Sequence, residues 1–162
     1  MSAVIERPVS IAELHAPLAS RGTEAPTFGE TSFAYGSLPP THTQSRTHGI
    51  HRVLDKLYSY RGLCQDWDGY GGEPATYASF TNAVEFVNRL PIRFNAPVSM
   101  LAGDGEISLF WKDNGCYLEV SFPGDNTYHY IFKNDKEQFA SPDIPFDGNG
   151  LDASLTAHLG RI

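Results

Sequence analysis

Two short turn sequences constrain the fold of this chain more than any other feature. Asp104-Gly105 and Asn114-Gly115 each lie between runs in which strongly apolar residues recur at every second position. Such a pair predicts a two-residue β-hairpin loop, because these residues adopt positive φ readily. Residues 98–133 are therefore expected to form antiparallel strands. The expected strands cover residues 98–102, 106–112, 116–122 and 127–133.

Two-residue loops at both turns also predict the pairing of the strands. The expected partners are Ala102–Ile107, Met100–Leu109 and Val98–Trp111 across the first turn, and Trp111–Leu118, Leu109–Val120 and Ile107–Phe122 across the second. Both hairpins then collect their strongly apolar residues on one face, so two independent turns agree with one burial pattern. The opposite face is expected to carry Ser99, Leu101, Ser108, Phe110, Tyr117, Glu119 and Ser121.

The face that the fourth strand buries depends on the loop at residues 123–126. An even loop places His129 and Ile131 on the core face and leaves the neighbouring rings beside Tyr117. An odd loop with a bulge instead buries three rings, those of Tyr128, Tyr130 and Phe132. Burial is the default expectation, because exposed aromatic stripes are rare without a partner.

Two amphipathic helices are predicted before the strands, at residues 48–61 and about 75–90. Their apolar residues recur at spacings of three and four. Ser45 or Thr47 is the expected cap of the first helix, and Pro74 marks the first turn of the second. The expected fold class is α+β, with two helices packed on one face of a four-stranded antiparallel meander.

The rest of the chain is expected to flank this core. Residues 1–46 read as an irregular N-terminal arm, 47–133 as the α+β core domain, and 134–162 as a loop followed by a short C-terminal helix. That helix is predicted from three leucines spaced four apart, starting at Leu151. Residues 28–38 are too apolar for a pure linker, so we expect them to pack on the outer face of the sheet or on a second copy of the chain, forming a homodimer.

The segment Asp66–Gly72 holds the chain's densest run of unusual residues, with two carboxylates around a Trp and three glycines around a Tyr. Glycine makes a continued helix or strand costly. A tight turn is therefore expected, with the ring of Trp67 mostly buried, the Asp68 carboxylate capping the backbone, and positive φ at one or more of the glycines. The residues assigned to this structural turn are Trp67, Asp68, Gly69, Tyr70 and Gly71.

The stretch Asp66–Pro74 lies between the two predicted helices and is followed by the segments Asp104–Trp111 and Tyr117–Val120. Together they resemble a broad group of small bacterial and phage accessory proteins with a W-D-G-Y-G-A-x-P motif. The resemblance covers about residues 50–133, and this chain has Gly72 where the group usually has Ala. It implies the α+β core and an accessory role, and no agreed activity comes with it.

Three acidic or histidine clusters are candidate chemical sites. Asp66, Asp68 and Glu73 could converge as a metal or acid–base site, which gives an alternative function, a small metal-dependent hydrolase. A second candidate is a surface cluster or zinc site of His42, His48 and His51. A third is a loop whose spacing misses that of an EF-hand, made of Asp143, Asp147, Asn149 and Asp152. No nucleophile-elbow, P-loop or dinucleotide-binding motif occurs, so no catalytic residue, metal or cofactor is expected.

Charge and composition favour a protein partner. The formal net charge is −7, which disfavours direct binding of nucleic acid or an anionic membrane and suits a basic partner, such as a nucleic-acid-binding protein. The expected interaction face consists of Phe110, Tyr117, Glu119, Tyr128 and Tyr130. The prediction is a non-enzymatic interaction module of the cytoplasm, acting as an accessory or inhibitory protein of antitoxin or phage anti-defence type.

Overall fold

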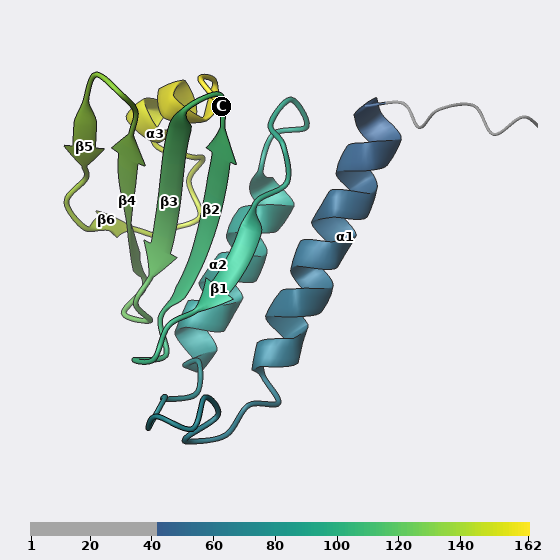
Figure 1. The fold of residues 1–162 in the computed structure, drawn as a ribbon, viewed down its shortest axis with the longest axis vertical. Helices are drawn as coiled ribbons and strands as arrows, with labels where there is room; N and C mark the ends of the chain where they lie inside the picture. The colour runs from purple at the N-terminus through teal and green to yellow at the C-terminus, as the bar shows by residue number, and fades with distance from the viewer. Residues whose placement is uncertain (1–41) are drawn as a thin grey trace, which may run out of the picture. The chain divides into compact units, whose positions relative to one another are not determined.

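A computed structural model describes residues 42–162, and it shows an α+β fold (Figure 1). The helices are α1 (His42–Tyr60), α2 (Tyr77–Arg89) and α3 (Ala153–Leu159). The strands are β1 (Val98–Leu101), β2 (Ile107–Asp113), β3 (Cys116–Phe122), β4 (Thr127–Lys133), β5 (Gln138–Ala140) and β6 (Ile144–Pro145). The predicted class is confirmed, although the sheet has six strands rather than four. The prediction for residues 28–38 lies outside the described residues.

All strand pairs are antiparallel, in the order β1-β2-β3-β4-β5, and β6 pairs with β4. Helix α1 contacts β1, and α2 contacts β2 and β3. The ring of His158 in α3 stacks on Phe132 of β4, with ring centroids 4.4 Å apart. The three helices thus lie on one face of the sheet, which we call the inner face (Figure 1). The opposite face is the outer face.

The turn at Asn114-Gly115 forms as predicted. Both residues have positive φ, 50° and 73°, so the loop contains two residues. The resulting register pairs Trp111 with Leu118, and the two further pairs expected across this turn are also present. The inner-face residues of the two central strands are buried as predicted, namely Ile107, Leu109, Trp111, Leu118, Val120 and Phe122.

The predicted register of β1 is wrong by one residue. Val98 pairs with Phe110, and Leu101 pairs with Ile107. The Gly105 N–H donates to the Ala102 carbonyl at 3.1 Å, and Gly105 alone of the loop has positive φ, 84°. This is a three-residue loop with a glycine bulge instead of a two-residue loop. Because side chains alternate along a strand, the extra residue exchanges the two faces of β1.

Strand β4 buries its aromatic residues, as the default expectation had it. Tyr130 pairs with Val120, and Phe132 pairs with Leu118. The rings of Tyr128, Tyr130 and Phe132 are all buried. Seven residues separate the partners Ser121 and His129, and this odd number places the rings on the core face. Gly124 and Asn126 of the loop have positive φ, 101° and 64°.

Helix α1 starts at His42, six residues before the predicted start, so capping by Ser45 or Thr47 is wrong. Tertiary contacts stabilise this extra length. The Arg46 guanidinium donates to the carbonyls of Phe94 and Leu90 at 2.8 and 2.9 Å. The segment 94–97 also approaches Gly49 so closely that a Cβ there would lie 2.8 Å from that of Ala96. Local propensity carries no signal for contacts of this kind.

The segment after β4 is partly a strand rather than the predicted loop. Strand β5 pairs with residues 131–133 of β4, and β6 pairs with residues 127–128. Between them, the Ser141 hydroxyl accepts the Tyr130 N–H at 2.8 Å. The two short strands therefore share one edge of β4. The predicted C-terminal helix is confirmed as α3, and Asp152 caps it by accepting the Leu155 N–H at 3.0 Å.

Candidate functional site

The outer face carries an apolar and aromatic patch over four neighbouring strands. Val98 and Met100 of β1 and Ile131 of β4 are exposed by 57%, 43% and 37% of their surface. We define the outer-face cluster as Val98, Met100, Phe110, Tyr117, Glu119 and Ile131. The register places Val98, Phe110, Glu119 and Ile131 in one row across the sheet. No helix in the described part of the chain contacts this face.

Three of the five predicted interaction residues meet at the centre of the outer-face cluster. The rings of Phe110 and Tyr117 stack with centroids 6.2 Å apart at 29°. The Tyr117 hydroxyl donates to the Glu119 carboxylate at 2.5 Å. Burial, together with this hydrogen bond and the negative charge of Glu119, raises the pKa of Tyr117 to about 12. Tyr117 thus stays neutral, and Glu119 holds its ring in place beside Phe110.

The structure does not place Tyr128 and Tyr130 on this face, which corrects their assignment to the interaction face. Both lie on the inner face, where their rings are buried in the core. The Tyr128 hydroxyl accepts the Asp152 N–H at 3.4 Å, and the Tyr130 ring lies 5.7 Å from that of His158. Val98 and Met100 are exposed and belong to the outer-face cluster. The predicted register placed them in the core, and the observed β1 register, shifted by one residue, turns them outward.

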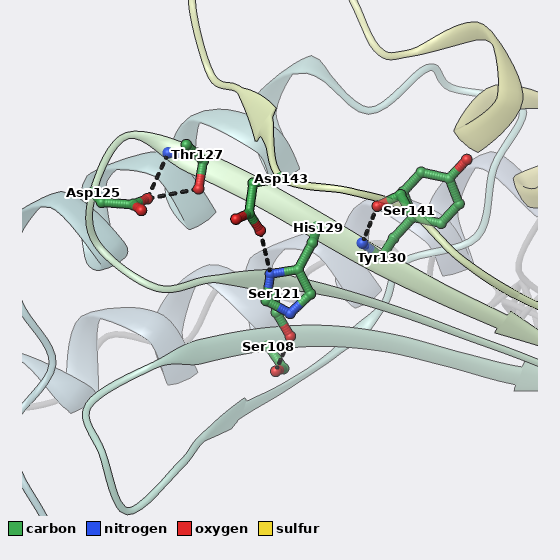
Figure 2. Close-up of polar contacts among 8 residues, drawn as sticks. All are labelled: Ser108, Ser121, Asp125, Thr127, His129, Tyr130, Ser141 and Asp143. Atoms are coloured by element: carbon green, nitrogen blue, oxygen red, sulfur yellow. Dashed lines mark hydrogen bonds and ion pairs between the residues drawn. The ribbon is translucent and has the colours of Figure 1, made fainter.

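A row of polar side chains crosses the outer face beside the cluster. Ser108, Ser121 and His129 are cross-strand neighbours, and Figure 2 shows Asp143 reaching His129 from the segment after β5. The two serine hydroxyls are 2.8 Å apart and buried. His129 Nδ1 lies 3.6 Å from Asp143 Oδ1 and is buried without a hydrogen-bond partner among the described residues. The pairing of β2, β3 and β4 is enough to bring the two serines and His129 together. No sequence pattern near Asp143 predicts its contact with His129.

Serine, histidine and aspartate side chains also occur in hydrolases, but this row lacks the geometry for acyl transfer. A contact of 3.6 Å is too long to orient the imidazole through a hydrogen bond. Both serines lie within paired strands, where backbone N–H groups bond the neighbouring strand. In the described residues this leaves no adjacent pair of N–H donors for an oxyanion. The row is best explained as polar packing between the strands.

Hydrogen bonds to its own carboxylates stabilise the Gly-rich turn, residues 66–72. Asp68 Oδ1 accepts the N–H groups of Tyr70 and Gly72 at 2.8 and 2.9 Å, and Asp66 Oδ1 accepts the Gly71 N–H at 2.7 Å. Gly69 and Gly71 have positive φ, as predicted. A Cβ at Gly72 would lie 2.8 Å from Asp68 Cγ and from Trp67 Nε1. An alanine at position 72 would therefore fit only if these side chains shift.

Trp67 is partly buried, and most of its side chain is covered, as predicted. Its indole N–H donates to the Glu73 carbonyl at 3.0 Å, and its ring packs against the edge of the core. Tyr70, in the middle of the same turn, lies at the surface, with 95% of its surface exposed.

The histidine cluster and the cluster at residues 143–152 are the other two candidates. His48 and His51 are exposed on α1, and the side chain of His42 is not described. Asp147 accepts the Asn149 N–H at 2.9 Å, whereas Asp152 caps α3. In residues 42–162, no three His, Cys, Asp or Glu side chains are grouped as a metal site would require.

The carboxylate of Asp68 makes stability depend on pH. Hydrogen bonds from the Tyr70 and Gly72 N–H groups lower the pKa of Asp68 below its ordinary value of 3.8. A lowered folded-state pKa stabilises the fold above pH 3.8, and this contribution is lost as the pH falls through the folded value. We expect Asp68→Asn to lower the Tm at neutral pH, and the difference from wild type to shrink in acid. Thermal melts across this range, with Asp55→Asn as control, measure it. A pH-independent difference contradicts this role.

Comparison with family models, curated proteins and solved structures found no match for this chain. No helix among residues 42–162 has the length and apolar character needed to cross a membrane.

Proposed function

We propose that this chain is a non-enzymatic protein-binding module that binds a partner protein through the outer-face cluster. The observation that carries the proposal is the exposure of Val98, Met100 and Ile131 around a fixed aromatic pair. An apolar patch centred on aromatic rings and bordered by polar residues is typical of a protein interface. Glu119 and the net charge of −7 favour a basic partner, such as a nucleic-acid-binding protein.

The wider role that we propose is accessory or inhibitory, of the antitoxin or phage anti-defence type, in the cytoplasm. The small size and acidity of the chain support it, as does the resemblance around Trp67–Pro74. Cys64 is an exposed free thiol, which suits a reducing compartment.

The alternative, a metal-dependent hydrolase, has less support. Asp66 and Asp68 each direct a carboxylate oxygen to backbone N–H groups of their own turn. A carboxylate engaged in this way has fewer lone pairs left for a metal ion. The structural role of these side chains is thus a sufficient explanation for their spacing.

Substitution of the outer face tests the proposal. The partner is first identified by cross-linking in the source cells and is then purified. We expect Val98→Asp with Ile131→Asp to weaken binding roughly 30-fold or more, because two charges would be desolvated at the interface. Isothermal titration calorimetry measures the affinity. Ile92→Asp with Tyr77→Asp is the matched control, since it adds the same two charges at exposed residues outside the cluster. Equal affinity of the double variant and wild type contradicts the proposal.

A further inference from the structure

A groove of about 550 Å³ runs between α1 and the segment that leads into β1. Its wall on α1 includes Arg46, Arg52 and Lys56, and its opposite side includes Val98 and Ser99. Figure 1 shows α1 and β1 alongside one another. The groove is separate from the polar row and from the Gly-rich turn, and it meets the outer-face cluster only at Val98.

The groove has the opposite charge to the chain as a whole. Three basic residues line it and no acidic residue does, although the chain has 19 Asp and Glu against 12 Lys and Arg. Arg46 is held by backbone carbonyls of the 90–94 segment. Arg52 and Lys56 are exposed, and neither forms an ion pair with a described residue. The Lys56 ammonium lies over the ring of Tyr60, 5.3 Å from its centroid. No carboxylate of the described residues engages either cation, so both can bind an anionic group.

The groove also borders the β1 edge of the sheet, which no other strand of the described residues covers. The Ala102 N–H donates to the Glu106 carbonyl at 2.9 Å, which sets the alternation of the β1–β2 ladder. Val98 and Met100 therefore bond β2, whereas the backbone groups of Ser99 and Leu101 point away from it. The Ser99 carbonyl accepts the Tyr60 hydroxyl of α1 at 3.1 Å, which confirms the direction. The Ser99 N–H remains available at the groove.

We propose that this groove binds an extended acidic peptide segment of a partner protein, which pairs with the edge of β1 and places carboxylates against Arg52 and Lys56. Alternate side chains on one side of an extended peptide are about 6.7 Å apart. Residues four apart on a helix rise by about 6 Å, so carboxylates at every second position match the two cations. Strand addition supplies backbone hydrogen bonds, and the cations select the sequence.

A nucleic acid fits the groove less well. Two free cations neutralise few phosphates, and the net charge of −7 repels a polyanion at longer range. A phosphate can pair only with the N–H groups of the β1 edge, whereas a peptide backbone pairs with both its N–H and its C=O groups. This site shares only Val98 with the outer-face cluster, and it selects a partner segment of the opposite charge.

Titration of the full ¹⁵N-labelled chain with a synthetic heptapeptide of alternating Glu and Val tests the proposal by NMR. We expect the amide signals of Ser99 and Leu101 to shift. Arg52→Glu with Lys56→Glu should weaken binding at least tenfold, whereas Lys112→Glu with Lys136→Glu, an equal charge change outside the groove, should not. A peptide with Lys in place of Glu should leave the signals unshifted. A Glu peptide with Pro in place of the central Val should bind at least tenfold more weakly, because Pro lacks the N–H that a strand pair needs.

Three results would overturn the inference. The first is no shift at Ser99 at millimolar Glu peptide. The second is equal binding of the Pro-containing peptide, which would show attraction of charges without strand pairing. The third is tighter binding of an oligothymidine at the same residues, which would identify a nucleic-acid site. Circular dichroism of each variant confirms that it folds, and none of these tests depends on the outer-face partner.

Discussion

Replacement of Phe86 by alanine is expected to lower the free energy of unfolding by about 3–5 kcal/mol. Phe86 on α2 is fully buried, and its ring lies 5.4 Å from that of Phe122 and 6.2 Å from that of Tyr128. These rings join the helix layer to β3 and β4. The substitution removes apolar burial and edge-to-face ring contacts and leaves a cavity. A small domain has only about 5–15 kcal/mol of net stability, so a large part of it would be lost.

Urea denaturation followed by far-UV circular dichroism measures this effect. Phe139→Ala is the matched control, because the same atoms are removed from a ring on the edge strand β5 that is 40% exposed. Its expected loss is smaller, since less apolar surface returns to water. Equal losses of unfolding free energy for the two variants would contradict a central position of Phe86 in the core between the helices and the sheet.

Replacement of Ser79 by alanine is expected to destabilise the fold by about 2–4 kcal/mol, despite removing a single oxygen. The buried Ser79 hydroxyl donates to the Phe122 carbonyl at 2.6 Å and accepts the Ile107 N–H at 3.1 Å. It therefore bridges the end of the β2–β3 ladder from α2. Its loss leaves two buried backbone groups unpaired, and each costs about 1–3 kcal/mol.

Amide hydrogen exchange gives a specific measurement for this variant. The Ile107 N–H should exchange faster in Ser79→Ala, together with the lower unfolding free energy. Thr81→Ala is the control, because the Thr81 hydroxyl bonds only carbonyls of its own helix, at 2.9 and 3.1 Å. If Ser79→Ala costs no more than Thr81→Ala, the two strands have closed the gap and bonded each other directly.

The two hairpin turns show what short sequence patterns determine and what they leave open. Asn114 and Gly115 both adopt positive φ, so their pair predicts loop length and register correctly. In the Asp104-Gly105 pair, only Gly105 does so, because the loop begins one residue earlier at Gly103. The dipeptide is equally compatible with both loops. Burial pattern did not separate them either, because Val98, Met100 and Leu101 are all apolar.

Long-range contacts account for the other differences. The first turns of α1 depend on Arg46 bonding carbonyls more than forty residues away. Strands β5 and β6 are too short for a period to appear, and they form because the β4 edge offers partners. In the candidate site, Phe110, Tyr117 and Glu119 followed from strand alternation. Asp143 did not, because only the return of the chain along β4 brings it to His129.

The bulge at Gly105 makes the surface chemistry of this protein a matter of loop length. With a loop one residue shorter, Ser99 and Leu101 would face solvent, and Val98 and Met100 would face the helices. The central strands would be unchanged in either case, since their register depends on another turn. A single insertion or deletion here would thus exchange the exposed apolar residues of β1 for a more polar pair, while the buried residues of the central strands stay the same. A Cβ at Gly105 would lie 2.7 Å from the Pro74 carbonyl oxygen. The segment before α2 therefore disfavours any residue other than glycine at this position of the loop.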